Sequence, residues 1–140
     1  MKNLKISHLL LITLVVLLMS FTKSDETKNS LIGTWQICGS DSQVEKNLGG
    51  KEGNTRYKII GETTFVVADV SLSDNTFTGD FLGTYTIDKN IYTEHIKLTY
   101  PGYKNYKDQV YTFQFELKND LLIVIGTNNK FNETWKRIKL

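Results

Sequence analysis

The chain has 140 residues, with 17 lysines and arginines against 15 aspartates and glutamates. Two of the basic residues, Lys2 and Lys5, lie in the first 22 residues, and without that segment the count is 15 against 15. The remaining chain is therefore close to neutral and lacks the basic stripe typical of nucleic-acid-binding proteins, so no nucleic-acid partner is expected.

Residues 1–22 have the pattern of a signal peptide. A basic start precedes the apolar run LLLITLVVLL at residues 9–18, which is short for a membrane-spanning helix, and Ser20, Thr22 and Ser24 follow it. We expect cleavage after one of these three residues, with an uncleaved anchor as the alternative. No lipoprotein cysteine follows the apolar run. The pattern predicts a secreted or periplasmic protein with no membrane span once the signal is removed.

The next eight residues, KSDETKNS at 23–30, are polar and are expected to form a tether. A domain of residues 31–140 follows, which is long enough for one hydrophobic core. Its single cysteine, Cys38, cannot form an internal disulfide. We expect an inert buried thiol, and an intermolecular bond is the alternative.

Alternating apolar and polar residues predict about eight strands in this domain. The expected strands cover residues 31–38, 56–60, 64–70, 77–87, 91–100, 109–117, 121–126 and 133–140. Most connections between them are short, and Gly83 is expected at a bend in its strand. This pattern favours an all-β fold, an up-and-down antiparallel barrel, over a Greek-key sandwich.

Two longer loops interrupt the strands. Residues 39–54 are rich in glycine and charge and are expected to form a loop over one barrel mouth, with a helical turn over 43–48. Residues 101–108, PGYKNYKD, are expected to form a second loop that carries Tyr103 and Tyr106.

The first and last expected strands each contain a tryptophan. Gly33 and Trp35 share one face of the first strand, and Trp135 and Arg137 share one face of the last. Because a closed sheet pairs its first strand with its last, Trp35 is expected near Trp135 or Arg137, with the guanidinium stacked on an indole. These residues predict a structural closure of one barrel end.

Four segments in order, LIGTWQIC, GTYTI, YTEHI and FNETWKRI, resemble the lipocalin-like (calycin) barrels. They are more closely similar to a family of small exported bacterial lipocalin-like proteins of unknown function. In lipocalins a Gly-x-Trp on the first strand meets a basic residue on the last, and the matching residues are Gly33, Trp35 and Arg137. The resemblance covers residues 31–140 and implies the fold and export. The shorter chain, without the disulfide of larger lipocalins, argues against a roomy ligand cup.

The barrel interior is the expected ligand site, lined by inward aromatic residues that include Trp35 and Phe115. The candidate ligand-binding residues are Tyr57, Phe65, Phe81, Tyr85, Tyr92, Glu94, Tyr111, Phe113 and Arg137; Gly33, Trp35 and Trp135 are assigned to closure.

Glu94 is the candidate of greatest interest, because an inward carboxylate needs a partner or a raised pKa. Arg137 is the expected partner. The pair is either structural, or Glu94 acts with Tyr92 and Tyr85 to hold the polar end of an apolar ligand.

Other chemistry finds little support in the sequence. His95 shares a strand face with Thr93 and Lys97 and is expected to face solvent; a haem ligand there would require a bulge that turns it inward. Asp69 and Asp80 are expected near loops or on the solvent face. No catalytic triad, phosphate loop or metal-ligand spacing is visible, so no cofactor or metal is expected and an enzyme is the least favoured class.

Two functions remain open at this stage. The preferred one is an exported barrel that binds a small, largely apolar molecule in its interior. The alternative is an envelope interaction module with a filled barrel, which binds a protein or a glycan through its loops. An open interior would favour the first, and an interior filled by its own rings would favour the second.

Overall fold

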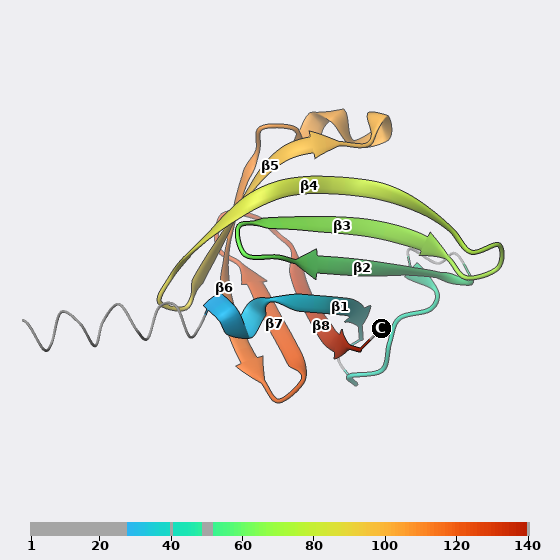
Figure 1. Ribbon diagram of the computed structural model, residues 1–140, viewed down its shortest axis with the longest axis horizontal. Coiled ribbons are helices and arrows are strands. Elements are labelled where there is room, and N and C mark those ends of the chain that lie inside the picture. The colour runs from blue at the N-terminus through green and yellow to red at the C-terminus, as the bar shows by residue number, and fades with distance from the viewer. Residues whose placement is uncertain (1–27, 40, 49–51, 140) are drawn as a thin grey trace, which may run out of the picture. The chain divides into compact units, whose positions relative to one another are not determined.

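In the computed structural model, eight antiparallel strands form a closed barrel in which each strand pairs with the next and β8 pairs with β1 (Figure 1). The structure describes residues 28–39, 41–48 and 52–139. The predicted signal peptide and the start of the predicted tether lie outside these residues. The all-β, up-and-down barrel predicted from the sequence is confirmed. No helix in the described ranges is long and apolar enough to cross a membrane.

The strand bounds agree closely with the sequence pattern, because each strand ends at a polar or glycine-containing turn. The strands are β1 Gly33–Cys38, β2 Asn54–Ile60, β3 Thr64–Ser71, β4 Thr76–Asp88, β5 Ile91–Thr99, β6 Val110–Lys118, β7 Leu121–Gly126 and β8 Asn132–Ile138. A 3-10 helical segment, η2, covers Pro101–Tyr106 between β5 and β6 and is the coiled ribbon beyond the end of β5 in Figure 1.

The expectation for the two longer loops was partly wrong. The loop at 101–108 contains η2, which begins at Pro101, where a fixed φ suits the first helical position. The helical turn expected over 43–48 does not form across residues 43–47. Isolated bridges pair Val44 with Cys38 and Asn47 with Asn54 instead.

Two irregularities bend the long strand β4. The pairing register shifts at Val67–Ala68 against β3 and at Leu82–Gly83 against β5. A side chain at Gly83 would collide with the His95 carbonyl oxygen and the Phe65 ring, so this position needs glycine. The second shift also explains why Leu98 is 61% exposed on the outer face although Ile96, two residues earlier, is buried.

A packed core fills one end of the barrel interior, which we call the closed end. Its fully buried residues come from both halves of the chain and include Leu31, Trp35, Ile60, Phe65 and Tyr92. The Tyr85 hydroxyl donates a hydrogen bond to the Gly61 carbonyl at 2.7 Å, so the polar tip of this core aromatic is satisfied by the β2–β3 turn.

Candidate ligand pocket

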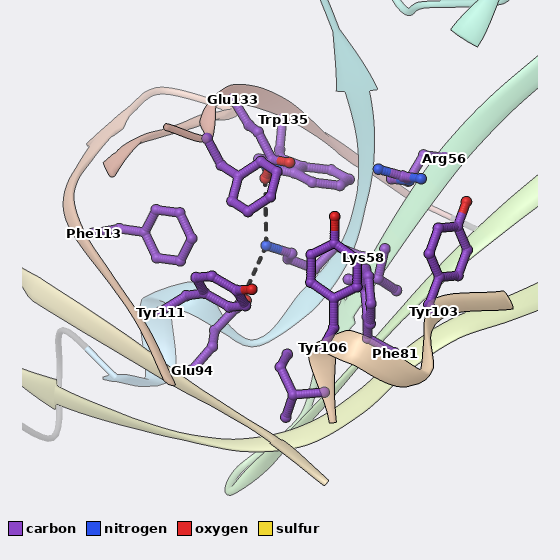
Figure 2. Close-up of a pocket in the computed structure, with 13 residues that line it drawn as sticks. Arg56, Lys58, Phe81, Glu94, Tyr103, Tyr106, Tyr111, Phe113, Glu133 and Trp135 are labelled. Atoms are coloured by element: carbon purple, nitrogen blue, oxygen red, sulfur yellow. Dashed lines mark hydrogen bonds and ion pairs between the residues drawn. The ribbon is translucent and has the colours of Figure 1, made fainter. Parts of the chain in front are cut away.

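A cavity of about 110 Å³ lies in the other half of the barrel interior, which we call the pocket end. Residues from β2 to β6, η2 and β8 surround it, together with Phe131 just before β8 (Figure 2). The lining residues are Arg56, Lys58, Val67, Phe81, Glu94, Ile96, Tyr103, Tyr106, Tyr111, Phe113, Phe131, Glu133 and Trp135.

A buried lysine lies between two carboxylates in this pocket. The Lys58 ammonium nitrogen is 2.9 Å from Glu94 Oε1 and 3.7 Å from Glu133 Oε2, and Figure 2 shows it between the two side chains. The same nitrogen is 4.7 Å from the centre of the Trp135 ring, a cation–π distance. Lys58 is only 2% exposed, so its charge is stabilised by these groups and not by water.

The two carboxylates keep Lys58 protonated. Burial alone would lower the pKa of this lysine, but the charges of Glu94 and Glu133 and the hydrogen bond to Glu94 outweigh it and raise that pKa above its ordinary value. The Tyr92 hydroxyl is buried close to the same carboxylates, and burial followed by the Glu94 charge raises its pKa well above the usual value. Tyr92 therefore stays neutral.

A second ion cluster lies beside the first. Arg56 donates to both Asp69 oxygens, at 2.6 and 3.0 Å, and to Asp80 Oδ2 at 3.0 Å. Burial, and then the Asp69 charge, raise the pKa of Asp80 to about 6, although Arg56 acts in the opposite direction. Asp69 and Asp80 were expected near loops or on the solvent face. Asp69 lies close to the β3–β4 turn, but the solvent-face alternative was wrong, because both side chains join Arg56.

Aromatic rings form a chain of edge and tilted contacts around the pocket. Phe81 contacts Tyr103 and Tyr106, each at 5.4 Å between ring centres; Tyr106 contacts Tyr111 at 6.3 Å, and Tyr111 contacts Phe131 at 5.5 Å. Two of these rings come from η2, so the turn after β5 forms one side of the pocket. We call these five rings the aromatic rim.

The closed end has the geometry that the sequence predicted. Trp35 pairs with Arg137 across β1 and β8, and the guanidinium carbon lies 4.0 Å from the centre of the indole ring. Arg137 also donates a hydrogen bond to the Ile32 carbonyl at 2.8 Å, while the Trp35 indole N–H donates to the Leu31 carbonyl at 2.9 Å. The predicted stacking of Arg137 on an indole is confirmed.

Gly33 is required by this closure. It adopts a φ of +148°, and a side chain added there would approach the Arg137 Nη1 atom to 2.5 Å. The glycine of the Gly-x-Trp pattern therefore leaves room for the guanidinium that covers the tryptophan.

Among the predicted ligand-binding residues, the structure brings four together in the pocket: Phe81, Glu94, Tyr111 and Phe113. Trp135, assigned to closure, also lines it. Phe65, Tyr85 and Tyr92 lie in the packed core, and Arg137 lies at the closed end. The predicted Glu94–Arg137 pair is wrong, since Lys58 occupies the position expected for the arginine. The expected outer position of His95 agrees with its strand, where the neighbouring Glu94 and Ile96 are buried.

Tyr57 was placed on the wrong face. It pairs with Gln36 while Lys58 pairs with the buried Trp35, so Lys58 faces inward and Tyr57 outward. The sequence contained a signal for this. A two-residue turn at Gly61-Glu62 would pair Lys58 with Phe65, and the observed connection pairs Ile60 with Phe65. Cross-strand partners share a face, so both registers place Lys58 on the inward face with Phe65.

The fold and the site together define a class, an all-β barrel with one packed end and one small, charged, aromatic pocket. The family model described as Domain of unknown function (DUF4488) matches residues 30–140, and the chain belongs to this family. Among curated proteins, none matches the chain.

Several solved chains match this fold. One of them is an uncharacterised protein from Bacteroides eggerthii DSM 20697, 15% identical in sequence, with a TM-score of 0.53. The match covers 76% of this chain and 98% of the other. At this identity the likeness supports the fold alone.

Proposed function

We propose that this protein is an exported barrel that binds a small, largely apolar molecule at its pocket end. The observation that carries this proposal is the cavity of about 110 Å³, lined by aromatic rings, by Lys58 with its two carboxylates and by Arg56 of the second ion cluster. Its interior differs from that of a plugged barrel, because the rings fill the closed end and leave space at the other.

The size of the cavity limits the ligand. Typical ligand pockets enclose roughly 300–1,000 Å³, whereas an engineered cavity of about 150 Å³ binds benzene. The cavity of about 110 Å³ therefore suits one ring or a short chain, with the remainder of a longer molecule extending past the aromatic rim. A lipocalin-like relationship of this family is part of the same proposal, and the Trp35–Arg137 closure supports it.

A matched pair of variants tests the proposal. Val67 lines the cavity, while its neighbour Val66 lies on the opposite face of β3. In native mass spectrometry of protein purified from its own source, wild type and Val66→Phe should retain a small molecule. Val67→Phe should lose it, because the larger ring occupies the cavity. If each of the three folded proteins shows only the mass of its own polypeptide, with no added ligand mass, the proposal is contradicted.

Export is proposed together with binding, on the basis of the signal-peptide pattern in residues 1–22. N-terminal sequencing of the native protein should find a mature start close to Lys23 or Asp25. Recovery of the protein with Met1 intact in a cytosolic fraction would contradict export.

One observation favours the alternative, an envelope interaction module. Ile59, Val66, Leu82 and Leu98 are successive cross-strand partners on the outer face of β2 to β5. Three of them are between 40% and 61% exposed, and exposed apolar rows of this kind mark binding surfaces for other proteins. Leu98→Lys should abolish partner capture without affecting a retained small molecule, which separates the two functions.

A further inference from the structure

The pocket end carries more negative than positive charge. Its two ion clusters contain two cations, Arg56 and Lys58. They also contain four carboxylates: Glu94 and Glu133, which line the cavity, and Asp69 and Asp80, which bind Arg56 beside it. With every group ionised, the formal charge of the two clusters is about −2, and each cation contacts two carboxylates.

We propose that the pocket selects an organic cation, an amine carried on a small apolar or aromatic body. This inference rests on the proposed function, because it specifies the ligand of the same cavity. It does not follow from cavity size, which would admit neutral and anionic molecules equally well.

The two cations are already engaged, so an anionic ligand would have to displace internal partners. Arg56 makes a two-point contact with Asp69 and a third bond to Asp80. Lys58 bonds to Glu94 at 2.9 Å and lies within 6.0 Å of four ring centres. An incoming carboxylate or phosphate would gain little from these cations and would be repelled by the surrounding acids.

The protonation behaviour of the clusters agrees with a negative interior. The pKa values of both Lys58 and Arg56 are raised although burial opposes this, and Glu133 contributes to both shifts. The pKa of Asp80 is raised as well, by burial first and by Asp69 second. The shifts of Lys58 and Arg56 mean that the carboxylates around them favour positive charge, whereas the shift of Asp80, led by burial, favours the neutral form of that carboxyl.

Glu133 is the carboxylate that a ligand can reach. Its side chain is 21% exposed and lines the cavity, whereas that of Glu94 is only 6% exposed. Its contact with Lys58, at 3.7 Å, is also longer than that of Glu94 at 2.9 Å. In Figure 2, Glu133 lies beside Trp135, on the other side of the Lys58 nitrogen from Glu94. A ligand ammonium group can therefore approach Glu133 without breaking the shorter Lys58–Glu94 bond.

The aromatic rim provides the second half of a cation site. The faces of aromatic rings attract ammonium groups, and tyrosine and tryptophan do so more strongly than phenylalanine. Three tyrosines of the lining, Tyr103, Tyr106 and Tyr111, stand in contact with one another around the cavity. Lys58 shows that the barrel already holds one ammonium group by this combination of carboxylates and rings.

Three probes with similar bodies and different charges test the inference: 2-phenylethylamine, 2-phenylethanol and 3-phenylpropanoate. Their affinities are measured by calorimetric titration of the folded protein at pH 7. We expect the amine to bind about tenfold more tightly than the alcohol, and the carboxylate to bind most weakly. Glu133→Gln should weaken amine binding by about tenfold and leave alcohol binding within about twofold, because it removes charge while keeping shape. Glu116→Gln, an exposed residue on β6, serves as the matched control and should change neither affinity.

The outcomes separate this inference from the function on which it rests. Similar affinities for all three probes, or tightest binding of the carboxylate, would overturn the cation inference and leave ligand binding intact. Tight amine binding that Glu133→Gln does not weaken would also overturn it, since the attraction would then come from elsewhere on the surface. Failure of every probe to bind the folded protein would contradict both the inference and the proposed function.

Discussion

Each end of the barrel interior pairs a cation with a tryptophan, but the two pairs differ in their surroundings. At the closed end, the Arg137 guanidinium stacks 4.0 Å from the Trp35 ring and donates to a backbone carbonyl. At the pocket end, the Lys58 ammonium lies 4.7 Å from the Trp135 ring and between two carboxylates. The first arrangement packs against a fully buried core, and the second faces a cavity.

This difference indicates that one end of a small barrel can provide most of the stability while the other end is left to bind a ligand. Rings that pack on one another at the closed end stabilise the fold by removing apolar surface from water. Rings at the pocket end make edge and tilted contacts with one another and leave a cavity between them. This cavity is the proposed ligand site. Substitutions at the two ends should therefore have different effects on unfolding.

The largest expected effect is at the closed end. Trp35→Ala should lower the free energy of unfolding by about 3–5 kcal/mol, the usual range for removal of a buried large aromatic residue. Tyr106→Ala, at the aromatic rim, should cost less than about 1 kcal/mol because that ring is only partly buried. Chemical denaturation of both variants measures the contrast. Equal losses would show that the pocket end contributes to stability as much as the closed end does.

The buried ion pair should have the next largest effect. Glu94→Gln leaves Lys58 with only the longer contact to Glu133, and should cost about 3 kcal/mol. The double variant Lys58→Met, Glu94→Gln should recover part of this loss, because the unpaired buried charge is gone. Thermal unfolding of the single and double variants tests this coupling. An unchanged melting temperature for Glu94→Gln, with loss of a retained ligand, would assign Glu94 to binding.

A smaller effect is expected from the glycine under Arg137. Gly33→Ala should cost about 1–2 kcal/mol, since it disfavours a φ of +148° and pushes the guanidinium away from Trp35. Gly79→Ala on β4 is the matched control, because an added side chain there meets nothing within 4 Å. Denaturation midpoints of the two variants should differ. Comparable midpoints would show that the closure tolerates a side chain at Gly33.

A further effect depends on pH. The folded-state pKa of Asp80, about 6, lies above its ordinary value of 3.8, so the folded protein binds this proton more tightly than the unfolded chain. The stability that this group contributes is therefore present below pH 4 and is lost as pH rises through 6. Relative to wild type, Asp80→Asn should become more stable between pH 4 and pH 7. Melting curves at pH 4, 5.5 and 7 should show this trend, and a constant difference would contradict the assigned shift.

The fold could be predicted from the sequence because its signals are local. Alternation in segments such as YTEHI predicted the strands, and the Gly33-x-Trp35 pattern with Arg137 on the last strand predicted the closure. The interior charges were harder to predict. Lys58 and Asp80 are common surface residue types. Either length of the β2–β3 turn places Lys58 inside, and its charge alone favoured an outward position. Asp80 lies next to the register shift between β3 and β4, which the alternation of residues does not reveal.

Cys38 can serve as a chemical probe of the pairing between β1 and β8, the pair of strands that closes the barrel. We call this pair of strands the seam. The thiol donates to the Thr134 carbonyl at 3.3 Å across β1 and β8, and its burial raises its pKa. A thiol reagent therefore attacks slowly in the folded protein, and separation of these two strands exposes the thiol. The rate of alkylation of the folded protein, divided by the rate for the unfolded chain, measures the fraction of molecules in which the thiol is exposed. Trp35→Ala should increase that rate more than Tyr106→Ala does, because the closed end holds the same seam together.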